Sequence, residues 1–331
     1  MSTAATPSAA PGGAPRAGAR PAARRLPLAG PTLGAVLALV ALVVLNALFT
    51  PNFATAGNFW NILWQVSTVT LVAVGMTFVI ATGGVDLSVG SVMAIAGALA
   101  ATQLRFGLPA AGFIAIAGAM AVGALNGALI ARDRIQPIVV TLATLIAGRG
   151  LAQVLSNDGQ LVPIRDAAAL AFGRGRLGPV PIPVIAAAVV VIVAWFVLRS
   201  TPFGRYVLAV GGNPAAARLA GVPVRRTIIS VYALSGLLAG FAGLLEASRL
   251  GASDAAKIGL NVELDAIAAV VVGGTALTGG RATIMGTVVG ALVMQVIATS
   301  FNMLLIPYAW SLVLKAAIIV VAVWFQRPKR V

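Results

Sequence analysis

The feature that most constrains this chain is a succession of long apolar segments separated by short connections. Ten can be marked along the sequence, at about residues 30–49, 62–82, 87–104, 109–131, 137–155, 180–199, 228–249, 262–276, 283–304 and 308–326. An α-helix needs about 20 apolar residues to cross the hydrocarbon core of a bilayer. Only 9% of the 331 residues are charged, whereas a soluble domain carries about 25%. We therefore predict an all-α polytopic membrane protein with about ten transmembrane helices.

Two of these segments, 87–104 and 262–276, are short and rich in glycine. The sequence leaves open whether each crosses the membrane completely or is re-entrant or broken. Each lies beside one of two similar stretches, Gly83–Met93 and Gly273–Thr283, which both follow an apolar run and precede a small-residue helix. Glycine-interrupted segments at corresponding places in two halves are typical of transporters built from structural repeats, and they indicate where the transport pathway lies.

The basic residues set the expected orientation of the helices. If the N-terminus lies in the cytoplasm and the ten segments alternate, 15 of the 23 lysines and arginines fall on the cytoplasmic side, six fall outside and two lie within segments. Cytoplasmic loops carry an excess of Lys and Arg, so we expect both termini in the cytoplasm. Residues 1–27, rich in Ala, Pro, Gly and Arg, are predicted to be a disordered cytoplasmic tail, and residues 28–331 to form the transmembrane domain.

The residue types that are missing exclude several kinds of chemistry. The chain has no Cys and no His, which removes disulfides, Ser-His-Asp triads and haem or zinc sites built on these residues. None of its lysines, Lys257, Lys315 and Lys329, stands in a Walker A frame. We expect no catalytic residue, no metal site and no cofactor on this chain, so that any ATP and Mg²⁺ are bound by a partner. The net charge of +15 is dispersed between apolar runs, which argues against a nucleic-acid partner.

The connection at residues 200–227 has four arginines and no acidic residue, so it is expected to face the cytoplasm. Within it, Asn213 suits a helix N-cap, Pro214 the first helical position and Gly221 the left-handed position after a helix. These signals predict a short helix outside the bilayer, which is either a docking helix for a cytoplasmic partner or a well-capped connecting loop. Its candidate functional residues are Asn213, Pro214, Ala217, Arg218, Leu219 and Gly221.

Asp86 is a carboxylate at or near membrane depth. A charge there is unfavourable, so such residues usually line a cavity or are paired. Gly83 and Gly84 let the chain turn, and Asp86 or Ser88 is suited to cap the helix that follows. Two compatible interpretations stay open: Asp86 belongs to a transport pathway, or it is only a helix cap at the edge of the bilayer.

Uncharged polar residues in or beside the apolar segments either join helices or offer hydrogen bonds to a neutral polyol in transit. With few charges in the membrane and no relay of Asp, Glu or His, the cargo is expected to be uncharged and a proton-coupled mechanism is disfavoured. The candidates for the translocation pathway are Asp86, Ser88, Asn126, Gln136, Gln295 and Asn302.

The remaining charged residues of the segments have simpler explanations. Glu263 and Asp265 start the eighth segment, where the helix dipole favours carboxylates. Glu246 and Arg249 are spaced as an ion pair within a helix, whereas Arg149 has no evident partner. Three GxxxG pairs predict close packing of helices: Gly123/Gly127, Gly236/Gly240 and Gly286/Gly290.

Several stretches together resemble a known family. The most specific is Gly83-Gly84-Val85-Asp86-Leu87-Ser88-Val89-Gly90-Ser91, and further matches are Thr201–Arg205, Gly212–Val222 and Glu263–Gly274. They are similar to the membrane-spanning permease subunits of bacterial ATP-binding-cassette (ABC) importers for monosaccharides, the ribose-type permeases, over about residues 35–326. Two short stretches, Gly251–Ala256 and Ala147–Gly150, look most similar to a galactofuranose/galactose-type branch.

The resemblance implies a fold similar to that of vitamin B12-type importer permeases, with two related halves. It implies a bacterial inner-membrane complex of two permease subunits, identical or different, two cytoplasmic ABC ATPase subunits and an external sugar-binding protein. The helix at residues 213–221 stands where that family has its coupling helix, so residues 200–227 would be a coupling loop. The glycines expected at structural turns and close contacts are Gly83, Gly84, Gly90, Gly273, Gly274, Gly279 and Gly280.

The implied function is ATP-driven import of a monosaccharide, ribose-like, galactose/galactofuranose-like or xylose-like, by alternating access. A partner chain would hydrolyse the ATP. The alternative from the residues themselves is a self-sufficient secondary transporter or channel for a small neutral solute. An intramembrane enzyme is disfavoured, because no acid/base or metal-binding set is visible in the sequence.

Overall fold

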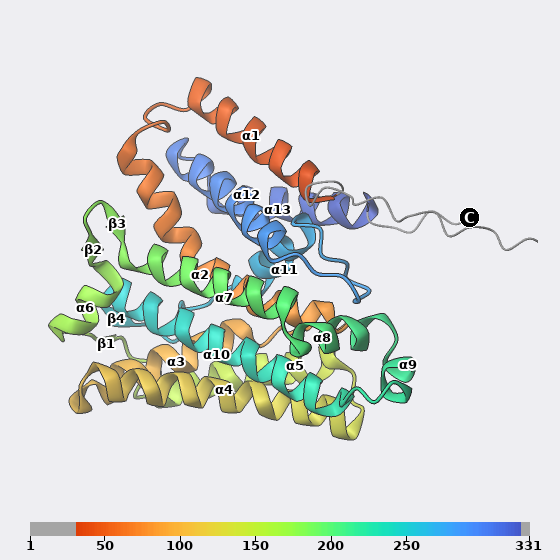
Figure 1. Ribbon diagram of the computed structural model, residues 1–331. Coiled ribbons are helices and arrows are strands. Elements are labelled where there is room, and N and C mark those ends of the chain that lie inside the picture. The colour runs from red at the N-terminus through yellow and green to blue at the C-terminus, as the bar shows by residue number, and fades with distance from the viewer. Residues whose placement is uncertain (1–30, 326–331) are drawn as a thin grey trace, which may run out of the picture.

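The computed structural model describes residues 31–325, so the tail predicted at residues 1–27 lies outside the described residues. Within them the chain folds almost entirely into helices (Figure 1). In chain order these are α1 (Pro31–Phe49), α2 (Ala56–Ala81), α3 (Val89–Gln103), α4 (Leu108–Asp133), α5 (Pro137–Leu155), α6 (Ala167–Arg174), α7 (Ile182–Ser200), α8 (Pro202–Gly212), α9 (Pro214–Leu219), α10 (Val224–Leu250), α11 (Val262–Val272), α12 (Ile284–Met303) and α13 (Tyr308–Phe325). A 3₁₀ turn, Leu104–Phe106, follows α3.

Four two-residue strands form two antiparallel pairs among the described residues. β1 (Val162–Pro163) pairs with β4 (Ala252–Ser253), and β2 (Arg176–Leu177) pairs with β3 (Val180–Pro181). All four belong to connections between the long helices, so they tie loops together rather than forming a sheet layer.

Eight of the described helices are long and apolar enough to cross a membrane: α1, α2, α3 with its 3₁₀ turn, α4, α5, α7, α10 and α12. α13 contributes a shorter apolar stretch, Ala309–Val321. α11 has 11 residues, which at about 1.5 Å per residue reach only about half of the hydrocarbon thickness. Each of the ten apolar segments thus corresponds to a helix, and the predicted all-α polytopic membrane fold is confirmed.

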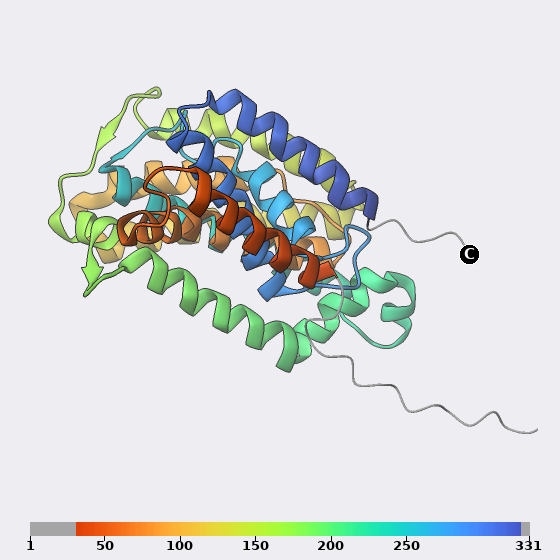
Figure 2. The ribbon, with the colours of Figure 1, turned by 90° about the horizontal axis from the view of Figure 1, so that it is seen from above.

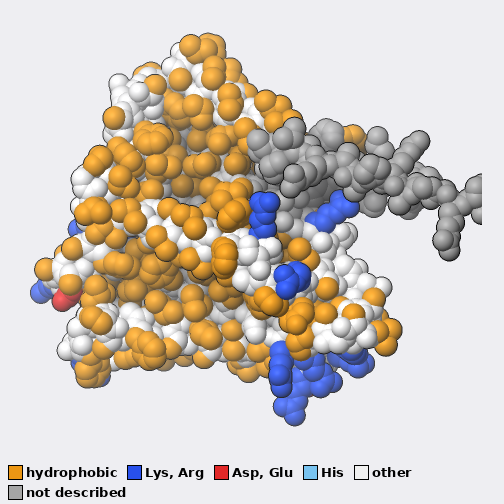
Figure 3. Space-filling model, in the orientation of Figure 1, with side chains coloured by type: hydrophobic (Ala, Val, Ile, Leu, Met, Phe, Trp, Pro, Cys, Tyr) orange, Lys and Arg blue, Asp and Glu red, His pale blue; other side chains and the backbone are white. Residues whose placement is uncertain are grey.

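The molecule has two distinct ends along the direction of its long helices. The start of α1, the end of α13 and the pair α8–α9 lie at one end, which we call the basic end, and α6 with the four strands lies at the other, the strand end (Figures 1 and 2). Figure 3 shows apolar side chains over most of the surface between them, with Lys and Arg gathered near α8 and α9. An apolar surface of this extent is typical of a membrane-embedded face.

Close helix packing depends on the glycines that the GxxxG pairs predicted. On α4, a Cβ atom at Gly123 would collide with the carbonyl oxygen of Tyr232 on α10. On α12, a Cβ atom at Gly290 would collide with the carbonyl oxygen of Ala269 on α11. The predicted packing role of these pairs is confirmed, because the backbones approach where a side chain has no room.

The third apolar segment is a broken span. α2 ends at Ala81, and the chain stays non-helical over residues 82–88 until α3 begins at Val89. This stretch enters the membrane, since Asp86 is hydrogen-bonded to Ser235 near the middle of α10. α3 then covers the remaining thickness, and Gly97 already lies beside Ser253 of β4 at the strand end.

The eighth segment is broken in the same way but in the opposite direction. After α10 ends at Leu250, residues 251–261 return from the strand end into the membrane without helical structure, apart from the pairing of β4. α11 begins beside the start of α3, where a Cβ atom on Gly90 would lie 2.5 Å from Oε2 of Glu263. α11 then runs toward the basic end, and with 11 residues it does not cross the membrane alone.

These breaks stand at equivalent places in two halves of the chain. α2–α5 and α10–α13 each consist of a long helix, a break, a short helix and two further helices. α2 runs from the strand end to the basic end and α10 runs the other way (Figure 1), so the halves are inverted relative to each other. The equivalent stretches are therefore 82–88 and 251–261.

The repeat inferred from the sequence does not coincide with this structural repeat. Gly273–Thr283 is the turn between α11 and α12, not the counterpart of Gly83–Met93. The two stretches are similar because both are glycine-rich turns at the basic end, and there they meet: the Gly280 N–H donates a 3.0 Å hydrogen bond to the Ala81 carbonyl oxygen.

Candidate functional site

α9 forms at the basic end for the local reasons that the sequence predicts. The Asn213 side-chain oxygen accepts hydrogen bonds from the backbone N–H groups of Ala215 and Ala216, both at 3.0 Å. Pro214 occupies the first helical position, and Gly221, just after the helix, has a left-handed φ of 80°. The predicted short, capped helix is confirmed.

One side of α9 is anchored and the other is free. Ala217 is buried with Val210 of α8 and Val224 of α10. In contrast, Arg218 is exposed and Leu219 is 92% exposed. An apolar side chain at the tip of a projecting helix is suited to enter a groove of another protein. The geometry of α9 therefore favours the docking interpretation over that of a mere connecting loop.

A buried polar network surrounds Asp86 at the start of α3. The Ser88 hydroxyl and backbone N–H both donate to Oδ1 of Asp86, at 2.6 and 3.0 Å. The Ser235 hydroxyl of α10 donates to Oδ2 at 2.8 Å. The Asn126 amide of α4 donates to the Ser88 hydroxyl oxygen at 3.0 Å, and Thr144 of α5 donates to Oδ1 of Asn126 at 2.6 Å. The network thus joins four helices.

The network is closed in this conformation. Asp86, Ser88, Asn126 and Ser235 are each at most 1% exposed, and both Asp86 oxygens accept hydrogen bonds. The N-cap position of α3 belongs to Ser88, and no side chain caps the helix there. The prediction of a side-chain cap is therefore wrong, because the Asp86 carboxylate is occupied by Ser88 and Ser235. Asp86 is paired rather than lining an open cavity.

The other three candidates for the translocation pathway do not join this network. Gln136 is exposed just before α5, at the basic end, and Asn302 is exposed near the end of α12. Gln295 connects α12 to α2, because its amide donates to Oε1 of Gln65 at 3.1 Å and to the Thr299 hydroxyl at 3.2 Å. Only Asp86, Ser88 and Asn126 of the six candidates are brought together.

Sequence reasoning missed Ser235 and Thr144, which complete the network. Each is a small hydroxyl residue within an apolar helix, like many others in this chain, and nothing local distinguishes it. Ser235 belongs to no sequence motif. It can be identified as a partner of Asp86 only from the fold, which packs α10 against residues 82–88.

Several charged side chains within the segments have partners, whereas Oε2 of Glu263 is buried without a hydrogen bond among the described residues. Arg249 and Glu246 form the predicted ion pair, with Nη2 and Oε1 3.0 Å apart. Lys315 of α13 and Asp265 of α11 form a second pair at 2.7 Å, which the sequence does not indicate. Arg149 donates to backbone carbonyl oxygens of residues 255–259.

The predicted structural glycines occupy turns and close contacts. Gly84 and Gly90 stand where a Cβ atom would strike the Tyr232 hydroxyl and the Gly259 carbonyl, and Gly273 packs on Gly286 in the same way. The remaining four have a left-handed φ, namely Gly83, Gly274, Gly279 and Gly280.

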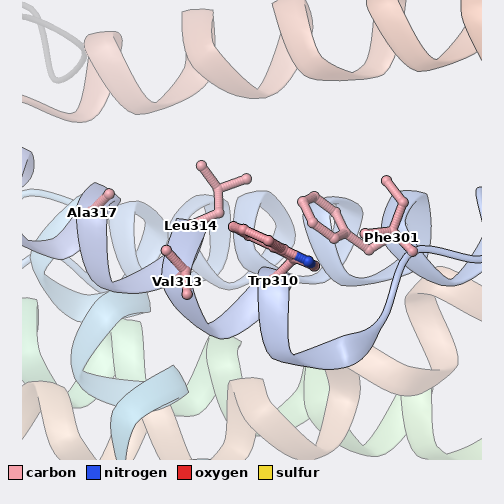
Figure 4. A pocket seen from close by; sticks show the side chains of 6 residues that line it. Phe301, Trp310, Val313, Leu314 and Ala317 are labelled. Atoms are coloured by element: carbon pink, nitrogen blue, oxygen red, sulfur yellow. The ribbon is translucent and has the colours of Figure 1, made fainter.

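A pocket between α12 and α13 offers nothing to a polar solute. Figure 4 shows Trp310, Val313, Leu314 and Ala317 of α13 facing it, with Phe301 from α12. Its volume is about 470 Å³, and Ile306 completes the lining. Because these side chains are apolar apart from the indole N–H, the pocket resembles a lipid-facing groove more than a sugar site.

Comparison with known proteins decides the family. The family described as branched-chain amino acid transport system / permease component matches residues 58–323. That range contains α9, the Asp86 network and both broken spans. The chain belongs to this permease family.

Individual relatives cover nearly the whole permease. The ribose import permease protein RbsC of Escherichia coli (strain K12) is 40% identical over 303 residues, 89% of this chain and 94% of that protein. The galactofuranose transporter permease protein YtfT of the same strain is 40% identical over 304 residues, 89% of each chain. The L-arabinose ABC transporter permease protein AraH of Azospirillum brasilense is 40% identical over 299 residues, 89% and 87% of the two chains. No solved structure matches the permease.

These identities confirm the resemblance to ABC permeases for sugars. They do not support the further resemblance to a galactofuranose/galactose-type branch. The relatives named for ribose, galactofuranose and arabinose are equally similar, so the comparison does not single out the galactofuranose branch. With its eight apolar helices among the described residues, the permease is a multi-pass membrane protein.

Proposed function

We propose that the permease is the membrane-spanning subunit of an ATP-driven importer that carries a monosaccharide into the cytoplasm. The observation that carries this proposal is α9, a capped helix outside the apolar zone that is anchored by Ala217 and presents Arg218 and Leu219. The chain has no Walker A motif, so ATP that drives transport would be bound by a partner, and α9 offers a surface on which such a partner can dock. Three relatives whose names refer to ribose, galactofuranose and arabinose support a sugar as the cargo.

The proposed assembly has two permease subunits, the same chain or a second one, and two ABC ATPase subunits that bind ATP and Mg²⁺. The ATPases dock at the basic end, which we place in the cytoplasm with both termini, because arginines gather there. An external sugar-binding protein docks at the strand end. The complex lies in the bacterial inner membrane.

Transport proceeds by alternating access in this proposal. The permease has no catalytic residue and contributes different contacts to each conformation, which is all that a coupling element needs. Asp86, Ser88 and Asn126 are sealed in the present conformation. A pathway that uses them therefore requires α3, α4 and α10 to separate, whereas Gln136, Gln295 and Asn302 would contribute from other places.

The docking role of α9 is tested by a double Arg218→Ala, Leu219→Ala variant reconstituted with its ATPase and binding protein. We expect normal membrane insertion but reduced sugar-stimulated ATP hydrolysis, because the docking side chains are lost. Leu125→Ala is the matched control, since Leu125 is an exposed leucine within α4, away from both proposed docking ends. Normal coupling in the double variant would contradict the proposal.

The alternative function, a self-sufficient secondary transporter or channel, is tested with vesicles that contain the permease alone. Sugar accumulation driven by an ion gradient, without any ATPase, would establish a secondary transporter instead. We expect no accumulation in these vesicles and ATP-dependent uptake when the partners are added.

A further inference from the structure

Residues 251–261, which we call the arm, connect the strand end to the middle of the membrane. At their outer end β4 pairs with β1, and Arg174 of α6 donates to the carbonyl oxygens of Arg249 and Leu250, both at 2.7 Å. Farther along, Ala255 and Ile258 are at most 1% exposed. The arm is therefore fixed to the strand end and buried along its inner side.

Arg149 of α5 holds the arm from inside the membrane. Its guanidinium donates to the carbonyl oxygens of Ala255 at 2.9 Å, Ile258 at 2.7 Å and Gly259 at 3.4 Å. A charge at this depth is rare and tends to mark function. Among the described residues Arg149 donates to no carboxylate, and all three bonds go to one non-helical stretch. The rigid donor fork of an arginine suits several carbonyls that lack helical partners.

α11 continues the arm and is tied to a second helix. Nζ of Lys315 on α13 lies 2.7 Å from Oδ1 of Asp265 in the first turn of α11, and the Lys315 side chain is only 9% exposed. Arg149 and Lys315 thus fasten one continuous segment, the arm with α11, to α5 and α13.

The turn that follows α11 contacts the end of α8, next to the N-cap of α9. In the α11–α12 turn, a Cβ atom on Gly280 would lie 3.0 Å from Cα of Gly212, and the Gly280 N–H donates to Ala81. Gly212 ends α8 and is followed directly by Asn213, the N-cap of α9. Backbone packs on backbone here, so a displacement of Gly212 cannot be absorbed by a flexible side chain.

These contacts form an uninterrupted path from α9 to the strand end. We propose that α11 and the arm transmit the movement of α9 across the membrane, and that Arg149 is the positioning residue that keeps the arm in register with α5. The inference rests on the proposed function, which supplies the partner that moves α9. α10 also leads from α9 to the strand end, but it packs against α2, α3 and α4. α11 packs against α2, α12 and α13, but the non-helical arm, not a continuous helix, joins it to the strand end.

The test uses a spin label on the arm. Because the chain has no Cys, a single Lys257→Cys variant can be labelled, and the Lys257 side chain is 80% exposed. The labelled permease is assembled with its ATPase in lipid nanodiscs, without binding protein, and the label mobility is compared with and without a non-hydrolysable ATP analogue. We expect the nucleotide to change the mobility, and Arg149→Gln to reduce that change about fivefold or more. Arg149→Lys, which keeps the charge but loses the fork, should give an intermediate change.

Arg105→Gln is the matched control, because Arg105 is exposed at the strand end and stacks on the Phe106 ring at 4.8 Å. It should respond to nucleotide as the unmodified chain does. Wild-type responses in both Arg149 variants would overturn the inference. So would a Lys257→Cys permease that imports sugar with ATP in vesicles with its binding protein, while its label in nanodiscs does not respond to the nucleotide. If Arg149→Gln does not assemble, Arg149→Lys decides by the same criteria. A permease that binds no ATPase at all would refute the proposed function, a result distinct from these.

Discussion

The Ser235 hydroxyl donates a 2.8 Å hydrogen bond to Asp86, a residue 149 positions earlier in the chain. The bond joins the middle of α10 to the non-helical stretch that precedes α3. Since backbone without helical bonds is unfavourable in a membrane, side-chain anchors of this kind decide whether the broken span is stable. The same reasoning applies to the arm and its contacts with Arg149.

Ser235→Ala removes one donor from the buried Asp86 carboxylate. We expect a loss of about 1–3 kcal/mol in stability, which thermal unfolding in detergent would show as a lower Tm. Ser230→Ala is the control, because Ser230 is exposed on the same helix, and its Tm should not change. Equal Tm values for the two variants would contradict a stabilising role of the network.

Gly90→Ala should disrupt the meeting point of the two short helices. The new Cβ atom would collide with the Gly259 carbonyl oxygen and lie 2.5 Å from Oε2 of Glu263, and overpacking of this kind costs about 1–3 kcal/mol or more. Size-exclusion chromatography should show less monodisperse protein. Gly150→Ala on α5 is the control, because its new Cβ atom has nothing within 4 Å, and it should behave as the unmodified chain. A well-folded Gly90→Ala protein would show that α3 and α11 can separate freely.

Lys315→Met breaks the ion pair with Asp265 and leaves a partly buried carboxylate without its partner. Breaking a buried pair costs about 3–5 kcal/mol, and we expect less here because the Asp265 side chain is 22% exposed. A double Lys315→Met, Asp265→Asn variant should recover part of the lost Tm, since no unpaired charge remains. If the Tm loss of the double variant equals the sum of the losses in Lys315→Met and Asp265→Asn alone, the two side chains are not coupled.

Asn213→Ala removes the cap of α9. Loss of an N-cap typically costs about 1 kcal/mol of helix stability, so we expect α9 to fray and sugar-stimulated ATP hydrolysis to fall. Asn213→Asp keeps an oxygen acceptor for the N–H groups of Ala215 and Ala216 and should retain the stimulation. If the Ala and Asp variants are equally active, the capped form of α9 does not matter for coupling.

The helical membrane fold follows from the sequence because each requirement is local. A helix that faces lipid needs about 20 apolar residues regardless of its neighbours, so ten apolar segments predicted ten helices. α9 was predictable for the same reason: Asn213, Pro214 and Gly221 bond or bend within a few residues of themselves.

The sequence could also point to Asp86 and to the two short segments, but it could not say what they do. The glycine content and the short length of segments 87–104 and 262–276 showed that they are unusual. Neither property showed that they are broken in opposite directions. The similarity of Gly83–Met93 to Gly273–Thr283 even suggested the wrong correspondence, because turns that serve the same local purpose have similar sequences wherever they lie.

By itself, then, the sequence determined the ten apolar helices, that they lie in a membrane and where α9 begins and ends, since hydropathy and capping act over a few turns of helix. Only the tertiary structure decided which side chains complete the Asp86 network, what Arg149 holds and which stretches of the two halves correspond. Those relationships join residues as far apart as 149 positions, and hydrogen bonds over such separations depend on how the helices pack.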